Sequence, residues 1–148
     1  MPHCKTRRRS VIAAVLCAIM TAGPAAAQIE DAAGRLVVEL NAVQSTEAGC
    51  TFSFLVINGL PEAIDSLVLE TVLFDSEGRV DRLTLFDFES LPAARPRVRQ
   101  FAVPGPSCDG FGAVLINGVQ TCETGGTTSS ACDDALDLNS RVGIDLLG

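Results

Sequence analysis

After residue 27 the chain contains no His, Lys, Tyr, Trp or Met. Without His or Lys, a Ser or Cys nucleophile has no ordinary base to activate it, which disfavours nucleophilic catalysis as a class. A glycosidase that uses a pair of carboxylates is the alternative class of enzyme, but a sugar-binding cleft without Trp or Tyr lacks its usual aromatic platforms. The sequence therefore predicts a protein that is not an enzyme and that carries no cofactor.

The first 27 residues differ from the rest in charge and hydropathy. Lys5 and Arg7–Arg9 form a positive segment, residues 11–22 form an apolar segment, and Ala25–Ala27 offers small residues for cleavage. This order is typical of a secretory signal peptide. The apolar run of about 12 residues is shorter than the roughly 20 that cross a bilayer, which favours removal over a permanent anchor. We expect a single mature domain over residues 28–148, in the periplasm or secreted.

Two export routes are open, because Thr6–Ile12 partly matches a twin-arginine signal. Twin-arginine substrates fold in the reducing cytoplasm, usually around a cofactor, whereas cysteines that pair need an oxidising compartment. Since the chain has no cofactor motif, the Sec route is favoured.

All 18 acidic residues follow position 27, together with only seven of the 11 basic residues, so the mature domain carries a net charge of −11. Such a charge repels nucleic-acid phosphates and anionic lipid surfaces. We therefore expect neither nucleic acid nor a membrane surface as a partner.

In the mature chain, apolar and polar residues alternate over short segments, as in β-strands, and no segment shows a long helical period. We predict seven strands, over Leu36–Val43, Cys50–Ile57, Leu67–Phe74, Val80–Phe86, Arg97–Val103, Phe111–Val119 and Arg141–Leu147. The pair Asn117-Gly118 leaves open whether the sixth strand is continuous or divided by a hairpin turn. The regular spacing predicts an all-β fold, a single antiparallel β-sandwich of two sheets.

Four cysteines remain in the mature chain and allow three pairings. If consecutive strands alternate in direction, the second and sixth run the same way, so Cys50 at the start of one lies near Cys108 just before the other. Cys122 and Cys132 then bracket the connection between the last two strands. We predict the disulfides Cys50–Cys108 and Cys122–Cys132. The absence of both His and a C-x-x-C motif favours structural bridges over a metal or redox site.

Five of the seven arginines of the mature chain fall within residues 79–99. Arg95, Arg97 and Arg99 alternate, and we expect them to project from one face of a strand. Their planar guanidinium groups suit a carboxylate, a phosphate or an acidic protein surface, which makes these three the candidate partner-contact residues. The alternative is an exposed row that pairs with neighbouring carboxylates and protects an edge strand from aggregation.

Acidic residues gather at two further places. The segment Asp75–Asp81 alternates acidic side chains around Gly78, but it is shorter than the roughly 12-residue loop that binds calcium, so a hairpin turn is favoured. The second group is Asp133, Asp134 and Asp137, for which we expect a role in capping a short helical turn. Cation binding is the alternative at both places.

A motif in the middle of the chain is formed by Val72–Asp75, Gly78, Val80, Leu91-Pro92 and Phe101. It resembles the FxLyD-type immunoglobulin-like modules of exported bacterial proteins, in which an aromatic-Asp pair ends a strand and a glycine turn follows. The resemblance covers roughly residues 50–103 and departs at Ala93-Ala94, where the modules have Gly. The whole chain is also similar to small uncharacterised exported proteins of Gram-negative bacteria. These resemblances imply that the predicted sandwich is an immunoglobulin-like antiparallel β-sandwich of about seven strands and that its location is periplasmic, and they imply no catalytic residue.

Two hypotheses about function follow. The first is a non-catalytic exported interaction or structural module of the bacterial envelope, whose partner is another envelope protein. The second is a periplasmic protein that binds a small ligand or a cation such as calcium with its acidic loops.

Overall fold

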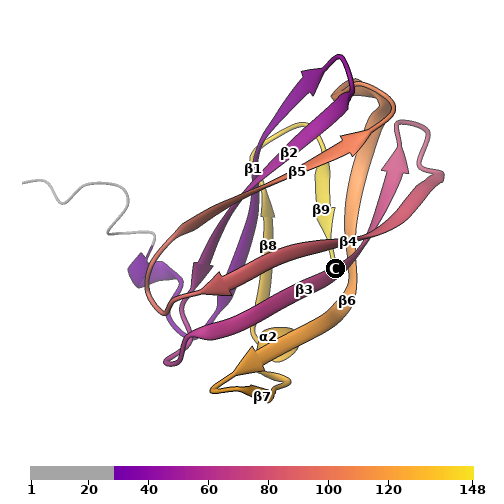
Figure 1. The fold of residues 1–148 in the computed structure, drawn as a ribbon. Helices are drawn as coiled ribbons and strands as arrows, with labels where there is room; N and C mark the ends of the chain where they lie inside the picture. The colour runs from indigo at the N-terminus through magenta and orange to yellow at the C-terminus, as the bar shows by residue number, and fades with distance from the viewer. Residues whose placement is uncertain (1–28) are drawn as a thin grey trace, which may run out of the picture.

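The structure is a computed structural model that describes residues 29–148, which form two β-sheets (Figure 1). Sheet A has the strand order β5-β2-β1-β8, and sheet B has the order β4-β3-β6-β7, with β9 also paired to β6. The strands of sheet A are β1 (Leu36–Thr46), β2 (Gly49–Asn58), β5 (Arg97–Pro104) and β8 (Leu136–Ser140). Those of sheet B are β3 (Ile64–Asp75), β4 (Val80–Leu91), β6 (Phe111–Thr124), β7 (Thr127–Thr128) and β9 (Asp145–Leu147).

Two short helical elements, η1 (Cys108–Gly110) and α2 (Ala131–Asp134), lie on either side of β6 along the chain. Within the described residues, no helix is both long and apolar enough to cross a bilayer. The predicted signal peptide, and with it the evidence for an export route, lies outside the described residues.

The first six predicted strands are confirmed, and the sixth is continuous. Asn117 forms a bulge inside β6, because its neighbours Ile116 and Gly118 pair with consecutive residues of β3. The hairpin turn comes later, at Gly125-Gly126, where both φ angles are positive and a two-residue loop joins β6 to β7.

The prediction of one last strand over Arg141–Leu147 is wrong. The chain first runs beside β1 as β8, then crosses between the sheets over residues 141–144 and runs beside β6 as β9. Ile144 is buried within this crossing, and its apolar side chain is the reason that the whole segment resembles a strand in the sequence. Over residues 29–148 the sandwich therefore has nine strands where seven were predicted, and it is not wholly antiparallel, because the pairings β1–β8 and β6–β9 are parallel.

This crossing closes one side of the sandwich, because β8 belongs to sheet A and β9 to sheet B. Figure 1 shows it as the yellow C-terminal chain. The Ser140 hydroxyl donates a hydrogen bond to the Ile144 carbonyl oxygen at 2.6 Å, which fixes the bend. On the other side, β5 and β4 are the end strands of their sheets, so within residues 29–148 each has one edge that pairs with no strand.

The core is centred on phenylalanines from both sheets. Phe52 and Phe54 of β2 are fully buried against Phe86 and Phe88 of β4, with ring centroids 5.5–6.5 Å apart. Phe101 of β5 stacks on Phe86 at 4.2 Å and packs near the open side. Aromatic pairs of this kind contribute about 0.5–1.5 kcal/mol each beyond the area they bury, so the cluster holds the two sheets together.

Buried polar groups in the described residues have partners. The amide nitrogen of Asn58 donates to the carbonyl oxygens of Glu62 and Leu91, each at 2.9 Å, and its amide oxygen accepts from the backbone N–H of Leu60 at 3.0 Å. No buried side-chain nitrogen or oxygen in residues 29–148 lacks a hydrogen bond. Asn58 thus ties the end of β2 to the end of β4.

Both predicted disulfides are present in the structure. Cys50–Cys108 joins the start of β2 to η1 with a Cα–Cα distance of 4.8 Å, and Cys122–Cys132 joins β6 to α2 with a distance of 6.0 Å. All four cysteines are buried. Two buried bridges indicate a chain that matures in an oxidising environment.

Removal of each disulfide should lower the free energy of unfolding by an amount that depends on the loop it closes. The sequence separations are 58 residues for Cys50–Cys108 and 10 for Cys122–Cys132. Loop entropy then predicts a loss of about 4 kcal/mol for the double Cys50→Ala, Cys108→Ala variant and about 3 kcal/mol for Cys122→Ala, Cys132→Ala. Urea unfolding of the two variants measures these losses, and a larger loss from the second would contradict the expectation.

Candidate functional site

Of the three arginines predicted to form one row, only two lie on the same strand face. Arg97 and Arg99 share the half-buried face of β5, in alternation with the exposed Val98 and Gln100. Arg95 is exposed in the connection that precedes β5, so the prediction that it projects from the strand is wrong. The strand begins only after the intervening proline, which lacks the backbone N–H that a strand ladder uses.

Arg99 bridges the open side of the sandwich. Its Nε donates to the Phe88 carbonyl oxygen at 2.8 Å, and one terminal nitrogen donates to the Ser90 carbonyl oxygen at 3.0 Å. The same nitrogen lies 3.4 Å from a carboxylate oxygen of Glu89, and the side chain is only 19% exposed. In the isolated chain this guanidinium group therefore binds the edge of β4.

Arg99→Ala should destabilise the domain by about 1–3 kcal/mol, because it leaves two carbonyl groups of β4 without the charged donor they now have. Arg95→Ala is the matched control and should change the free energy of unfolding by less than about 0.5 kcal/mol, as is usual for an exposed side chain. Equal effects of the two substitutions in chemical denaturation would show that Arg99 does not bridge the sheets.

The acidic turn after β3 has the predicted hairpin geometry, with Gly78 at φ +78°. One oxygen of Asp75 accepts the backbone N–H groups of Glu77 and Arg79 at 2.9 Å, and the other accepts from the Arg79 guanidinium at 2.9 Å. The backbone hydrogen bond from Arg79 is the main reason that the pKa of Asp75 lies below its ordinary value; burial opposes it, and the other bonds add to it. Both carboxylate oxygens are thus already engaged within the turn.

The second acidic group is divided between two elements. Asp133 and Asp134 lie in α2, the helical turn that the sequence predicts, whereas Asp137 lies in β8. Asp134 accepts a hydrogen bond from the Ser130 hydroxyl at 3.0 Å. The side chain of Ser130 makes no capping hydrogen bond to the helix, whereas the Ser129 hydroxyl accepts the backbone N–H of Ala131, the first residue of α2, at 3.1 Å. Across residues 29–148, no set of three or more His, Cys, Asp or Glu side chains is grouped to hold a metal ion.

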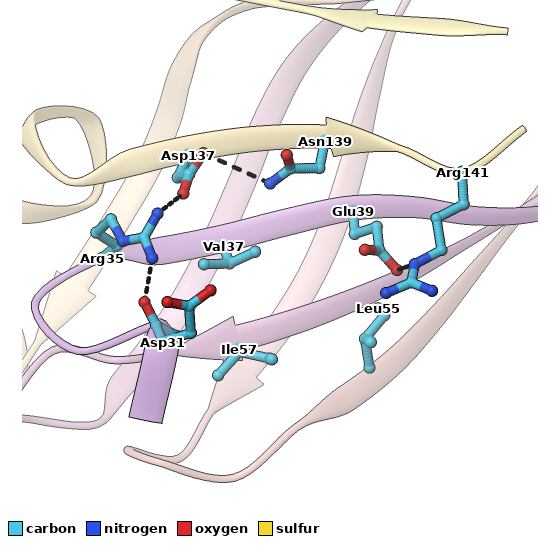
Figure 2. A pocket seen from close by; sticks show the side chains of 10 residues that line it. Asp31, Arg35, Val37, Glu39, Leu55, Ile57, Asp137, Asn139 and Arg141 are labelled. Carbon is cyan, nitrogen blue, oxygen red and sulfur yellow. Dashed lines mark hydrogen bonds and ion pairs between the residues drawn. The ribbon is translucent and has the colours of Figure 1, made fainter. Parts of the chain in front are cut away.

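A hollow of about 320 Å³ lies on the outer face of sheet A (Figure 2). Val37 of β1 and Leu55 and Ile57 of β2 form its apolar floor. An arginine lies at each end, Arg35 just before β1 and Arg141 just after β8. The parallel pairing of β1 with β8 brings these two arginines to one surface, and that pairing was not predicted from the sequence.

Each arginine of the hollow is paired with a carboxylate. Arg35 donates to the carboxylate of Asp137, and Arg141 donates to Glu39 at 2.8 Å. Burial raises the pKa of Glu39, but the hydrogen bonds from Arg141 and Asn41 and the charge of Arg141 outweigh it, so the pKa lies below the ordinary value. The same pair raises the pKa of Arg141. A ligand at either end would therefore compete with an existing ion pair.

The lowered pKa of Glu39 predicts a pH dependence of stability. A carboxylate whose folded pKa is below its unfolded value of about 4.3 stabilises the fold above that value, and the stabilisation is lost as the pH falls through the folded pKa. Glu39→Gln removes this contribution, so its free energy of unfolding should fall less steeply than that of the wild type below about pH 5. Identical slopes in denaturation series at several pH values would contradict the assignment.

The outer face of sheet B carries an apolar row that crosses four strands. The cross-strand pairings form one continuous row, which consists of Leu83 (β4), Val72 (β3), Leu115 (β6) and Leu147 (β9). A second row of the same pairings consists of Val80, Phe74 and Ala113 and ends at Asp145 of β9. With Leu85, two residues along β4 from Leu83, these make a surface of eight residues, here called the apolar face: Val72, Phe74, Val80, Leu83, Leu85, Ala113, Leu115 and Leu147.

Four members of the apolar face are large and exposed to solvent by 47–64%: Val80, Leu83, Leu85 and Leu147. An exposed sheet face is ordinarily covered by polar side chains, with the apolar ones on the inner face. Contiguous apolar patches on a soluble domain mark sites of contact with other molecules. A hollow of about 410 Å³ adjoins the apolar face where Phe74 and Ala113 meet, and Asp75 and Asp145 also line it.

Sequence reasoning did not identify the apolar face. In β4 both sets of alternate residues contain apolar side chains, Leu83 and Leu85 on one and Phe86 and Phe88 on the other, so the alternation does not tell which face is buried. Comparison with known proteins adds no family: a scan against family models, a search of curated proteins and a search of solved structures each find no match.

Proposed function

We propose that this chain is a non-catalytic interaction module, exported to the bacterial envelope, that binds another envelope protein through the apolar face. The observation that carries the proposal is the continuous row from Leu83 to Leu147 across four strands of sheet B, with both end residues about half exposed. Covering such a surface is favourable by about 25 cal/mol for each Å² of apolar area removed from water.

The charge of the chain supports a selective contact at this face. The domain after residue 27 carries a net charge of −11, which opposes random association between copies and with other acidic proteins. The row from Leu83 to Leu147 contains no charged member, and the carboxylates that border it are Glu70, which pairs with Leu85, and Asp145, which pairs with Ala113. A partner with a matching apolar surface therefore meets no charge along this row. Arg95 and Arg97 are a further expected contact for acidic groups of the partner.

The two disulfides support a periplasmic or secreted location, since thiols in the cytosol are kept reduced. The resemblance of residues 50–103 to modules of exported bacterial proteins supports the same location. Binding of calcium is the less favoured function, because the carboxylate of Asp75 is engaged by Arg79 and by two backbone N–H groups.

Single arginine substitutions on the two sheets test the proposal. Val80→Arg and Leu147→Arg place a charge at opposite sides of the apolar face, and Val98→Arg is the matched control, since Val98 is 60% exposed on β5 of sheet A. A partner retained from an envelope extract by the wild type should be retained by Val98→Arg and lost by both face variants. Far-UV circular dichroism checks that each variant folds.

Retention of the partner by both face variants would remove the apolar face as the contact site. Equal loss with Val98→Arg would show that the capture depends on general surface hydrophobicity and not on this face.

A further inference from the structure

The open side of the sandwich leaves one edge of β4 without a strand partner among the described residues. β4 pairs with β3 along its other edge, and β5 approaches it only through side chains such as Arg99 and Phe101. Every second backbone N–H and C=O along such an edge points outward, which makes it a template for another strand.

Two features limit the part of the β4 edge that is free to pair with another strand. Arg99 occupies the carbonyl oxygens of Phe88 and Ser90 at one end. At the other end the register between β3 and β4 shifts, because Leu73 pairs with Arg82 whereas Phe74 pairs with Val80, so Asp81 is bulged. Bulges interrupt strand pairing. The stretch that is open to a new strand is therefore Arg82–Phe86.

We propose that a second copy of this chain pairs with this stretch, so that the two copies of sheet B join edge to edge. The side chains of directly paired residues in an antiparallel ladder lie on the same face of the sheet. When a two-fold axis relates two identical strands, this condition requires the axis to pass beside one residue, which then lies opposite its own copy. Only an axis through Thr84 uses the whole stretch. It places Thr84 opposite itself, Leu83 opposite Leu85 of the second copy, and Arg82 opposite Phe86 of the second copy.

The side chains of the stretch suit this pairing. Leu83 and Leu85 are 58% and 52% exposed, and on pairing each covers the other and joins the two apolar faces into one surface. On the inner side, Arg82, Thr84 and Phe86 line a hollow of about 270 Å³ between β4 and β5, which has room for side chains of the added strand.

The distribution of charge opposes a second copy less at this edge than at the edges formed by β7, β8 or β9. Residues 75–104, which include β4 and β5, contain five arginines and five acidic residues, a net charge of zero. The rest of the domain after residue 27 contains two arginines and 13 acidic residues, a net charge of −11. A two-fold contact along β4 brings the neutral segments together, whereas contact through the edges formed by β7, β8 or β9 brings acidic segments together.

This pairing goes beyond the proposed function and does not require it, because the edge of β4 can join two copies whether or not the apolar face binds another protein. If both hold, the dimer offers an envelope partner a surface of twice the size.

Sedimentation equilibrium of the purified mature domain, over the micromolar range, tests the inference. The wild type should dimerise, and Leu85→Arg should weaken the dimer about tenfold, because the two-fold axis makes each substitution remove two Leu83–Leu85 contacts. Leu147→Arg is the matched control on the far strand of the apolar face and should leave dimerisation unchanged. A wild type that is monomeric throughout, or a Leu147→Arg variant as weak as Leu85→Arg, would overturn the edge pairing.

A second measurement fixes the register without depending on the arginine variants. A mixture of Leu83→Cys and Leu85→Cys proteins should be joined by a short thiol crosslinker, because the axis through Thr84 places these positions opposite each other. Leu147→Cys protein should give no crosslinked dimer. Crosslinking of Leu147→Cys as efficient as that of the mixture would contradict the proposal. Capture of an envelope partner is measured separately, so failure of the dimer and failure of the proposed function are distinguishable.

Discussion

The passage of the C-terminal chain from sheet A to sheet B is the constraint on which the rest of the structure depends. By pairing first with β1 and then with β6, residues 136–147 tie both sheets together on one side, and Cys122–Cys132 fixes the point from which this segment starts. No such segment covers β4 and β5 in the described residues. The open side, the bridging role of Arg99 and the unpaired stretch of β4 all follow from this asymmetry.

The parts of the fold that local chemistry determines could be predicted from the sequence. Alternating apolar residues located six strands, and the direction of consecutive strands was enough to pair Cys50 with Cys108. The end of the chain could not be predicted in the same way, because β8 and β9 are five and three residues long and are strands only by virtue of parallel partners distant in sequence. The buried Ile144 made the crossing look like part of a strand.

The candidate surfaces also depend on contacts between residues distant in sequence, which the sequence alone does not give. The sequence pattern identified Arg99 by its charge, yet the role of Arg99 depends on where β4 lies. Its partners are backbone carbonyl groups, which every residue type has, so the sequence does not indicate them. The apolar face depends on the register of four strands, and a shift of one residue in β4 would turn Leu83 and Leu85 inward. Charge composition, by contrast, was informative at once, because a net charge of −11 limits which surfaces can meet.

Native-state hydrogen exchange tests the central claim most directly, which is that the C-terminal chain closes one side of the sandwich and leaves the edge of β4 open. The account predicts slow exchange for ladder amides of β8 and β9, and fast exchange for the outward amides of Arg82–Phe86 in the monomer. Fast exchange throughout β8 and β9, as in a loop, would contradict it.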